Sequence, residues 1–408
     1  MSKIRVALLC GLLAVGLIEI GCGGGNTARQ AFMPASGTQT SNGGSSGASA
    51  PAAGSGSSSS NSGANSSPGT TVPAGATLTT YKTNLIAASD WVASHSTLPD
   101  GAILYTSNRI VPYYSNIAAM GMTKDPSKIG QVRAWMEWYV AHLNSHDVWG
   151  LGNTIYDYNV SGTTETPAND ADSTDSYPAT FLSLALQFYQ TGDPNAQWYV
   201  KSIAAQLDAI GQSLVRTQQG DGLTWAKPNY QIKYLMDNCE VYRGMKDAAA
   251  LFQALGNGSK AAFYNSHASA ALQGIMSMWM GHAFAVYKDN GGNLAAPNWG
   301  KWYADAVSQL YPVLEQVLPA SDPKVQEVYW RFNTAWQNWA NFSFNTSDPF
   351  PWVLVSNAAA RMGDSGRVNT YIVNVQHLYV NKGFPWPFYS MEAGFFMQVN
   401  AYYAGEGF

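Results

Sequence analysis

The chain has 408 residues, of which 12% are charged and 13% aromatic, and its formal net charge is −4. This slightly acidic balance excludes a protein built mainly to bind nucleic acid, which would need a basic face. Only one of the three cysteines, Cys239, lies beyond the first 22 residues, so we expect no disulfide in the folded part.

Residues 1–22 have the composition of an export signal. Two positive charges precede an apolar run over 6–20, which is shorter than a typical membrane-spanning helix. The run ends at Gly21-Cys22 and resembles the processing site of bacterial lipoproteins, although Glu19 stands where an aliphatic residue is usual. We expect a lipid on Cys22 that anchors the protein at the periplasmic or outer face of the cell envelope. Without the lipid, the protein would be secreted.

Residues 23–77 form a low-complexity segment rich in Ser, Gly, Ala, Thr and Asn. Such a composition cannot bury enough apolar surface to offset the entropy lost on ordering. We therefore expect a flexible linker between the anchor and a folded domain over 78–408.

From residue 80 onward, apolar residues recur at three- and four-residue spacing, which predicts one helix after another. The chain therefore predicts an all-α domain. The expected helices are 80–95, 108–121, 128–145, 174–191, 195–217, 235–256, 259–280, 301–318, 323–341, 351–362, 365–380 and 388–403.

The connections between these helices alternate between two kinds. Short turns begin the second helix of each pair, and their Asp or Asn would cap that helix while a following Pro fits its first turn. They are 124–126, 192–194, 256–258, 321–323 and 363–365. The others are longer and rich in aromatic, acidic and amide residues: 146–172, 218–234, 281–300, 342–350 and 381–387. This alternation of short and long connections indicates a repeat of helical hairpins, each of which must bury its apolar face against its neighbours.

Twelve helices in six hairpins resemble the (α/α)6 toroid of the six-hairpin glycosidase superfamily, over about residues 80–408. The resemblance implies that one helix of each pair lines an inner barrel. It also implies that the long loops at the N-terminal ends of those helices form a substrate cleft. It further implies a glycoside hydrolase acting on a polysaccharide or oligosaccharide, with inversion of configuration and no cofactor.

Two acidic clusters lie at such helix starts, offset by 65 residues: Asp172 with Asp175, and Asp237 with Glu240. Glycoside hydrolysis needs one carboxylic acid to protonate the leaving oxygen and a carboxylate to activate water or attack carbon. Asp175 and Asp237 are the leading acid–base pair in this interpretation, with Asp172 and Glu240 close behind as catalytic candidates. The competing interpretation is that each acid is a helix cap, which the same spacing favours.

The same helix starts carry aromatic and polar residues suited to sugars, whose C–H faces stack on rings and whose hydroxyls bond to planar polar groups. We expect the substrate-binding residues to be Asp170, Tyr177, Asn238, Tyr242, Arg109, Trp299, Trp302, Asp305, Trp352, Trp386, Tyr389 and Glu392.

Two other functions remain open at this point. A polysaccharide lyase on the same toroid would use a Tyr–Arg pair, such as Tyr105 with Arg109 or Tyr242 with Arg243. A surface lipoprotein that binds glycans without cleaving them would keep the aromatic residues but have no acid–base pair. No metalloprotease, nucleotide-binding or dinucleotide-binding motif is present, and we expect a monomer whose membrane contact is the lipid alone.

Overall fold

Six helices form the inner wall of the fold. Each contacts the next, and the last contacts the first, so that the ring closes. They are α3 (Pro112–Met122), α5 (Ser176–Gln190), α8 (Leu235–Ala254), α10 (Tyr311–Leu314), α12 (Leu354–Arg361) and α14 (Ser390–Tyr403). The computed structural model describes residues 76–344 and 349–408. Cys22, the signal segment and the expected linker up to residue 75 lie outside the described residues.

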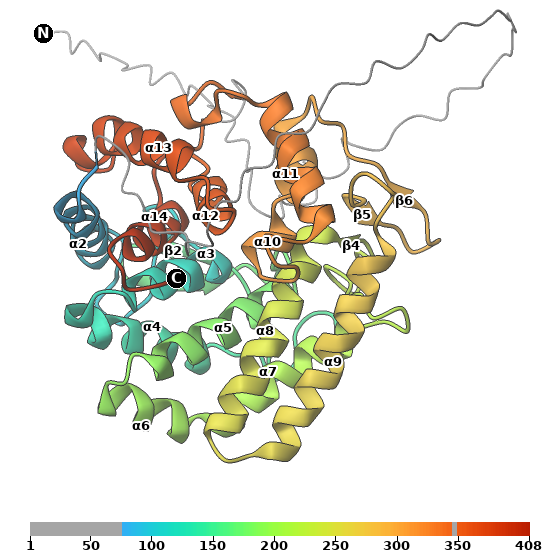
Figure 1. Ribbon diagram of the computed structural model, residues 1–408. Helices are drawn as coiled ribbons and strands as arrows, with labels where there is room; N and C mark the ends of the chain where they lie inside the picture. The colour runs from blue at the N-terminus through green and yellow to red at the C-terminus, as the bar shows by residue number, and fades with distance from the viewer. Residues whose placement is uncertain (1–75, 345–348) are drawn as a thin grey trace, which may run out of the picture. The chain divides into compact units, whose positions relative to one another are not determined.

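A second layer of helices packs around this ring (Figure 1). It consists of α2 (Leu78–His95), α4 (Ile129–Ala141), α6 (Pro194–Ser202), α7 (Ala204–Thr217), α9 (Gly258–Ser277), α11 (Pro323–Ala335) and α13 (Ser365–Leu378). The arrangement is an (α/α)6 toroid. The fold predicted from the alternation of short and long connections between helices is therefore confirmed.

Burial separates the two layers. All eleven residues of α3 are buried, whereas the outer helix α9 buries six of its twenty. Inner helices approach one another closely at glycines. A Cβ on Gly394 of α14 would lie 2.3 Å from the Ile117 carbonyl oxygen of α3, and one on Gly244 would lie 2.5 Å from the Ala179 oxygen. The core therefore lies between the layers and across the inner ring.

Short turns lead into the outer helices, and five of them supply a side-chain cap as predicted. The side chains of Asp125, Asp193, Asn257, Asp322 and Asp364 each accept a hydrogen bond from a backbone N–H of the following turn. Asp193, for example, accepts from Asn195 at 2.8 Å and from Ala196 at 3.0 Å. These caps satisfy N–H groups that the helix itself leaves unpaired.

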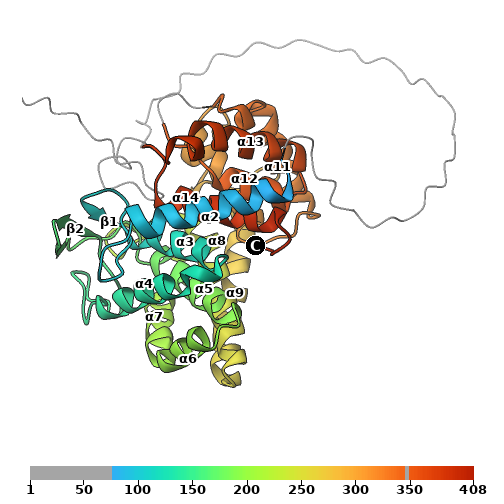
Figure 2. The same cartoon turned by 90° about the vertical axis from the view of Figure 1, so that its left-hand side faces the viewer.

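The long loops carry two small antiparallel sheets, which the helical pattern did not predict. The first has the order β1 (Arg109–Ile110), β2 (Tyr158–Ser161), β3 (Thr164–Pro167). The second has the order β4 (Lys233–Tyr234), β5 (Tyr287–Lys288), β6 (Leu294–Ala295). Figure 2 shows β1 and β2 at the end of the ring opposite the C-terminus. We call the end formed by the long loops the rim.

Three predicted helices are interrupted, one of which is the run 323–341, where a turn over 336–338 separates α11 from a short 3₁₀ turn. The run 195–217 divides at Ile203 into α6 and α7. The run 301–318 holds a π-helical segment, Trp302–Ala306, followed by the four-residue α10, because Tyr303 has extended dihedral angles. Short 3₁₀ turns occur at Pro126–Lys128, Trp339–Asn341 and Val380–Lys382. Within the two described ranges, no helix is both long and apolar enough to cross a membrane.

Candidate active site

Five aromatic rings gather at the rim, where α3, α12 and α14 begin. The Tyr389 ring lies 5.0 Å from Tyr105, 5.3 Å from Tyr114, 5.2 Å from Phe350 and 6.4 Å from Trp386, measured between centroids. Tyr389 is buried, whereas Trp386 is 54% exposed. The cluster therefore presents a solvent-facing indole on a packed aromatic base, which is the kind of surface on which a sugar ring stacks. We call these five residues the aromatic platform.

A polar network adjoins the platform and centres on Asp157, which immediately precedes β2. Arg109 donates to its Oδ2 at 2.9 Å, and the Tyr177 hydroxyl donates to its Oδ1 at 2.8 Å. The backbone N–H of Asp172 donates in turn to the Tyr177 oxygen at 3.3 Å. Burial raises the pKa of Asp157 to about 6, although its bonds to Arg109 and Tyr177 oppose the rise. This network fixes the backbone that carries Asp172, whose side chain is only half-buried.

The first two turns of α8 place Asp237 and Glu240 beside this network. The Tyr113 hydroxyl donates to Glu240, and the Tyr113 ring lies 6.2 Å from that of Tyr177 and 5.7 Å from that of Tyr114. Burial raises the pKa of Glu240 well above its usual value, and the carboxylates of Glu315 and Asp237 raise it further. Tyr113 thus joins the platform, the Asp157 network and the α8 acids into one region.

Asp175 and Asn238 also lie here, but both are enclosed. Asp175 is the N-cap of α5, and its carboxylate accepts hydrogen bonds from the Ser176 N–H at 2.9 Å, from the Ser173 hydroxyl and from the Thr224 hydroxyl at 2.6 Å. Asn238 accepts from the Thr224 N–H at 2.8 Å and donates to the Tyr234 carbonyl at 2.8 Å. These bonds favour structural roles, and for Asp175 they favour the capping interpretation over the catalytic one.

Four further residues expected at the substrate are held within the protein. Glu392 accepts from the backbone N–H groups of Trp352 and Val353 at 3.1 and 2.7 Å, so it holds the turn that leads into α12. Asp305 accepts a hydrogen bond from the Asn298 N–H at 2.7 Å. This bond fixes the loop that precedes the π-helical segment. The Trp302 ring is 2% exposed and stacks on Phe344 at 4.5 Å. Trp352 is buried, with its ring 4.9 Å from that of Tyr303.

The remaining expected residues lie around the periphery. Asp170 is exposed and pairs with Lys227 at 3.0 Å, and Trp299 is half-buried in the loop before the π-helical segment. Tyr242 lies about 7.5 Å further along the axis of α8 than Asp237, at 1.5 Å per residue, and therefore away from the rim.

Three residues of this region were not singled out from the sequence: Asp157, Tyr113 and Tyr114. The pair Tyr113-Tyr114 follows Pro112 in the first turn of an inner helix, and this position is a signal that could have identified it. Asp157 carried no such signal, because its loop gave no sign of the strand β2. In the described part of the chain, no cluster of three or more His, Cys, Asp or Glu side chains is placed to hold a metal ion.

No protein-family model and no curated protein sequence matches this chain. Several solved structures, in contrast, match this chain. A GH63 mannosylglycerate hydrolase from Thermus thermophilus, in complex with glucose, has a TM-score of 0.55 at 10% identity and covers 77% of this chain and 98% of its own. A metal-independent α-mannosidase from Streptococcus pneumoniae has a TM-score of 0.57 at 11% identity, and the match covers 80% of this chain and 94% of the mannosidase. An uncharacterized conserved protein from Thermus thermophilus has a TM-score of 0.56 at 11% identity, and the match covers 77% of this chain and 99% of that protein. At such identities the likeness establishes the fold, which these proteins share with the chain.

Proposed function

We propose that this protein is a glycoside hydrolase whose cleft lies at the rim, between the aromatic platform and the first turn of α8. The observation that carries the proposal is the junction at Tyr113. This residue joins a stacking surface with an exposed Trp386 to a group of carboxyl residues near the starts of α5 and α8. Stacking rings beside paired carboxyl groups are what hydrolysis of a glycosidic bond requires.

Within this region we propose Asp172 and Asp237 as the acid–base pair. Asp172 is half-buried at the rim, and Asp237 lies in the first turn of α8, one turn nearer the rim than Glu240. Glu240, whose pKa is raised by burial and by the neighbouring carboxylates of Glu315 and Asp237, lies one turn below Asp237. Asp157 and Arg109 act by positioning Tyr177, and through it the backbone of Asp172.

The named neighbours guide the choice of substrates for the test. Because they include a mannosylglycerate hydrolase and an α-mannosidase, the panel begins with α-mannosides and α-glucosides and extends to larger polysaccharides. The proteins compared are the wild type, Asp172→Asn, Asp237→Asn and the cap variant Asp175→Asn. Removal of a general acid or base costs about 10²–10⁴-fold in rate, so the first two variants should lose hydrolysis to that extent.

Aryl glycosides with good leaving groups then separate the two roles. A variant that lacks the acid should recover most of its rate on them, because a good leaving group needs no protonation, whereas a variant that lacks the base should not recover. If the wild type cleaves no glycoside on the panel but binds one, the protein is the non-catalytic glycan-binding lipoprotein. Elimination products that absorb in the ultraviolet would instead identify a lyase.

We further propose inversion at the anomeric carbon. The measurement is the configuration of the first sugar released, followed by NMR before mutarotation; a product that keeps the configuration of the substrate rejects it. We also propose that Cys22 is lipidated and anchors the protein to the cell envelope. Cys22→Ala should then move the protein from the membrane fraction to the soluble fraction, and an unchanged distribution contradicts the anchor.

A further inference from the structure

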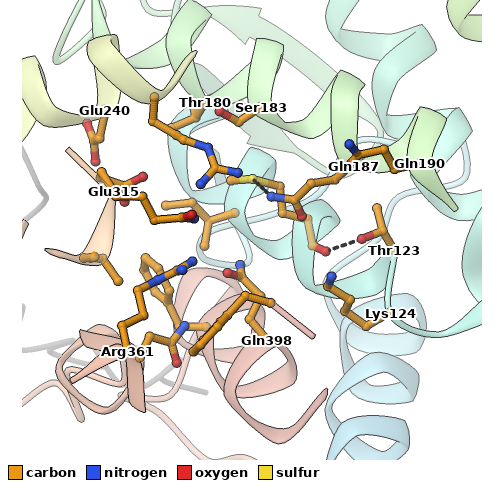
Figure 3. Close-up of a pocket in the computed structure, with 18 of the residues that line it drawn as sticks. Thr123, Lys124, Thr180, Ser183, Gln187, Gln190, Glu240, Glu315, Arg361 and Gln398 are labelled. Carbon is orange, nitrogen blue, oxygen red and sulfur yellow. Dashed lines mark hydrogen bonds between the residues drawn. The ribbon is translucent and has the colours of Figure 1, made fainter. Parts of the chain in front are cut away.

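A cavity of about 280 Å³ lies on the axis of the ring, at the end opposite the rim. Its walls include the C-terminal ends of inner helices, such as Gln190 of α5 and Arg361 of α12, and the loop after α3 at Lys124. Glu240 and Arg243, from the N-terminal half of α8, complete the wall. Figure 3 shows Glu240 and Glu315 on one side of it and Lys124 and Gln187 on the other. The volume is close to the lower limit of small-molecule sites, which measure about 300–1,000 Å³. The cavity is therefore close in size to a small-ligand site, and of the candidate active-site residues described above only Glu240 lines it.

Five polar atoms of residues that line the cavity are buried without a hydrogen-bond partner among the described residues. They are Gln187 Oε1, Asn357 Oδ1, Asn357 Nδ2, Arg361 Nε and Gln398 Nε2. Asn357 is 1% exposed, and its whole amide group is unsatisfied. A buried polar group that is left unpaired is costly. The residues that carry these atoms all belong to the wall of the cavity, which is therefore rich in amide and guanidinium groups.

The charges around the cavity do not call for a charged ligand. The lining holds three cationic side chains, those of Lys124, Arg243 and Arg361, and three carboxyl side chains, those of Glu240, Glu315 and Glu406. Arg243 is also paired with Asp247, with its Nε 2.6 Å from the carboxylate. A ligand of net charge would leave an uncompensated charge in this partly buried place, which is costly.

The amide and hydroxyl side chains of the lining favour a ligand with hydroxyl groups. Three of the five unsatisfied atoms are N–H donors and two are carbonyl acceptors. A hydroxyl group both donates and accepts, so a molecule with several hydroxyls can bond to both kinds. We propose that the axial cavity binds a small neutral polyhydroxylated molecule, no larger than a monosaccharide, at a site that shares with the candidate active site only Glu240. This inference concerns binding and does not depend on hydrolysis at the rim.

Water is the competing occupant, because buried waters commonly make about three hydrogen bonds each to otherwise unsatisfied groups. The test is therefore saturable binding of four probes at millimolar concentration: glucose, mannose, myo-inositol and glycerol. Binding is measured by ligand-observed NMR and by calorimetry on the full chain. The Asp237→Asn background is used throughout so that no probe or contaminant is turned over.

Three variants in that background locate the site. Asn357→Leu replaces the unsatisfied amide by an apolar side chain of similar size and should weaken binding by about tenfold or more, which equals a loss of about 1.4 kcal/mol. Trp386→Ala alters the aromatic platform, and the saturable binding that Asn357→Leu weakens should persist in it. Gln398→Leu changes a half-buried lining residue and serves as the second cavity variant if Asn357→Leu does not fold.

Two results would overturn the proposal. The first is no saturable binding of any of the four probes, which means that the cavity holds water only. The second is binding that Trp386→Ala abolishes and the cavity variants leave intact, which places the ligand at the rim. Either result leaves the hydrolysis proposal standing, because that proposal is judged by product release from glycosides. Conversely, if the wild type hydrolyses no glycoside while Asn357→Leu loses probe binding, that pair of results supports the proposal for the cavity and rejects the proposal of hydrolysis.

Discussion

Asp157 is a buried carboxyl group held between a phenol and a guanidinium, with a pKa raised by burial to about 6. In the unfolded chain its pKa would be about 3.9. The folded state therefore binds this proton more tightly. The resulting stabilisation is complete below about pH 4 and is lost as the pH rises through about 6, a change of about 3 kcal/mol for two pKa units.

Asp157→Asn removes this titration. We expect its free energy of unfolding, relative to the wild type, to improve by about 2–3 kcal/mol between pH 4 and pH 7. Urea unfolding of both proteins at several pH values measures the difference. A difference that does not change with pH would show that Asp157 does not titrate in this window, and would also remove the support for a carboxyl group with a raised pKa beside Tyr177.

Asp175 illustrates how one carboxylate at a helix start can have either of two roles. Its three hydrogen-bond donors include the Thr224 hydroxyl, from a loop 49 residues away in sequence. Asp175→Ala should lower the free energy of unfolding by about 2–4 kcal/mol, because it removes a cap and leaves buried donors unpaired. Hydrolysis per folded molecule should stay within a few-fold of the wild type.

The matched control for this substitution is Asp193→Ala, the cap of α6 on a short turn, which should cost only about 1 kcal/mol. Chemical unfolding measures both values, and activity is normalised to the folded fraction. Loss of hydrolysis in a fully folded Asp175→Ala protein would return Asp175 to the catalytic pair. The sequence could not separate the two roles, because both place an acid at the same position and only the distant Thr224 distinguishes them.

Glycines set the distance between inner helices. Gly394 of α14 faces the backbone of α3, where a Cβ would lie 2.3 Å from an oxygen. Gly394→Ala should therefore lower the free energy of unfolding by about 1–3 kcal/mol through overpacking, even though alanine favours helix by about 1 kcal/mol. Gly366 of α13 is the control, because a Cβ added there would have no atom within 4 Å. Gly366→Ala should be neutral or stabilising, and equal melting temperatures for the two variants would contradict this view of the ring.

The elements that follow from local chemistry were predicted, and those that depend on distant partners were not. The short turns carry their own caps, so their positions and the helices they begin could be predicted. The sheets of the long loops pair strands from separate segments, such as β1 with β2, and their two- to four-residue strands leave no periodic pattern. Asp157 was missed for this reason. Asp172 and Trp386, in contrast, could be placed at the rim from the alternation of short and long loops alone.

The closed ring makes the domain one cooperative unit, because each inner helix is buried by both of its neighbours. Removal of α14 would expose faces of α2, α3 and α12 together. A chain that ends at residue 388 should therefore show no cooperative thermal unfolding and should elute as an aggregate or an expanded species.

A chain that ends at residue 403, just after α14, is the matched control for this truncation. It should keep a cooperative transition and hydrolysis at the rim, because no residue that it loses belongs to the aromatic platform, the Asp157 network or the α8 acids. Circular dichroism melting and size-exclusion chromatography compare the two chains. A cooperative transition in the shorter chain at nearly the wild-type temperature would mean that five hairpins bury a sufficient core, and that closure of the ring contributes little to stability.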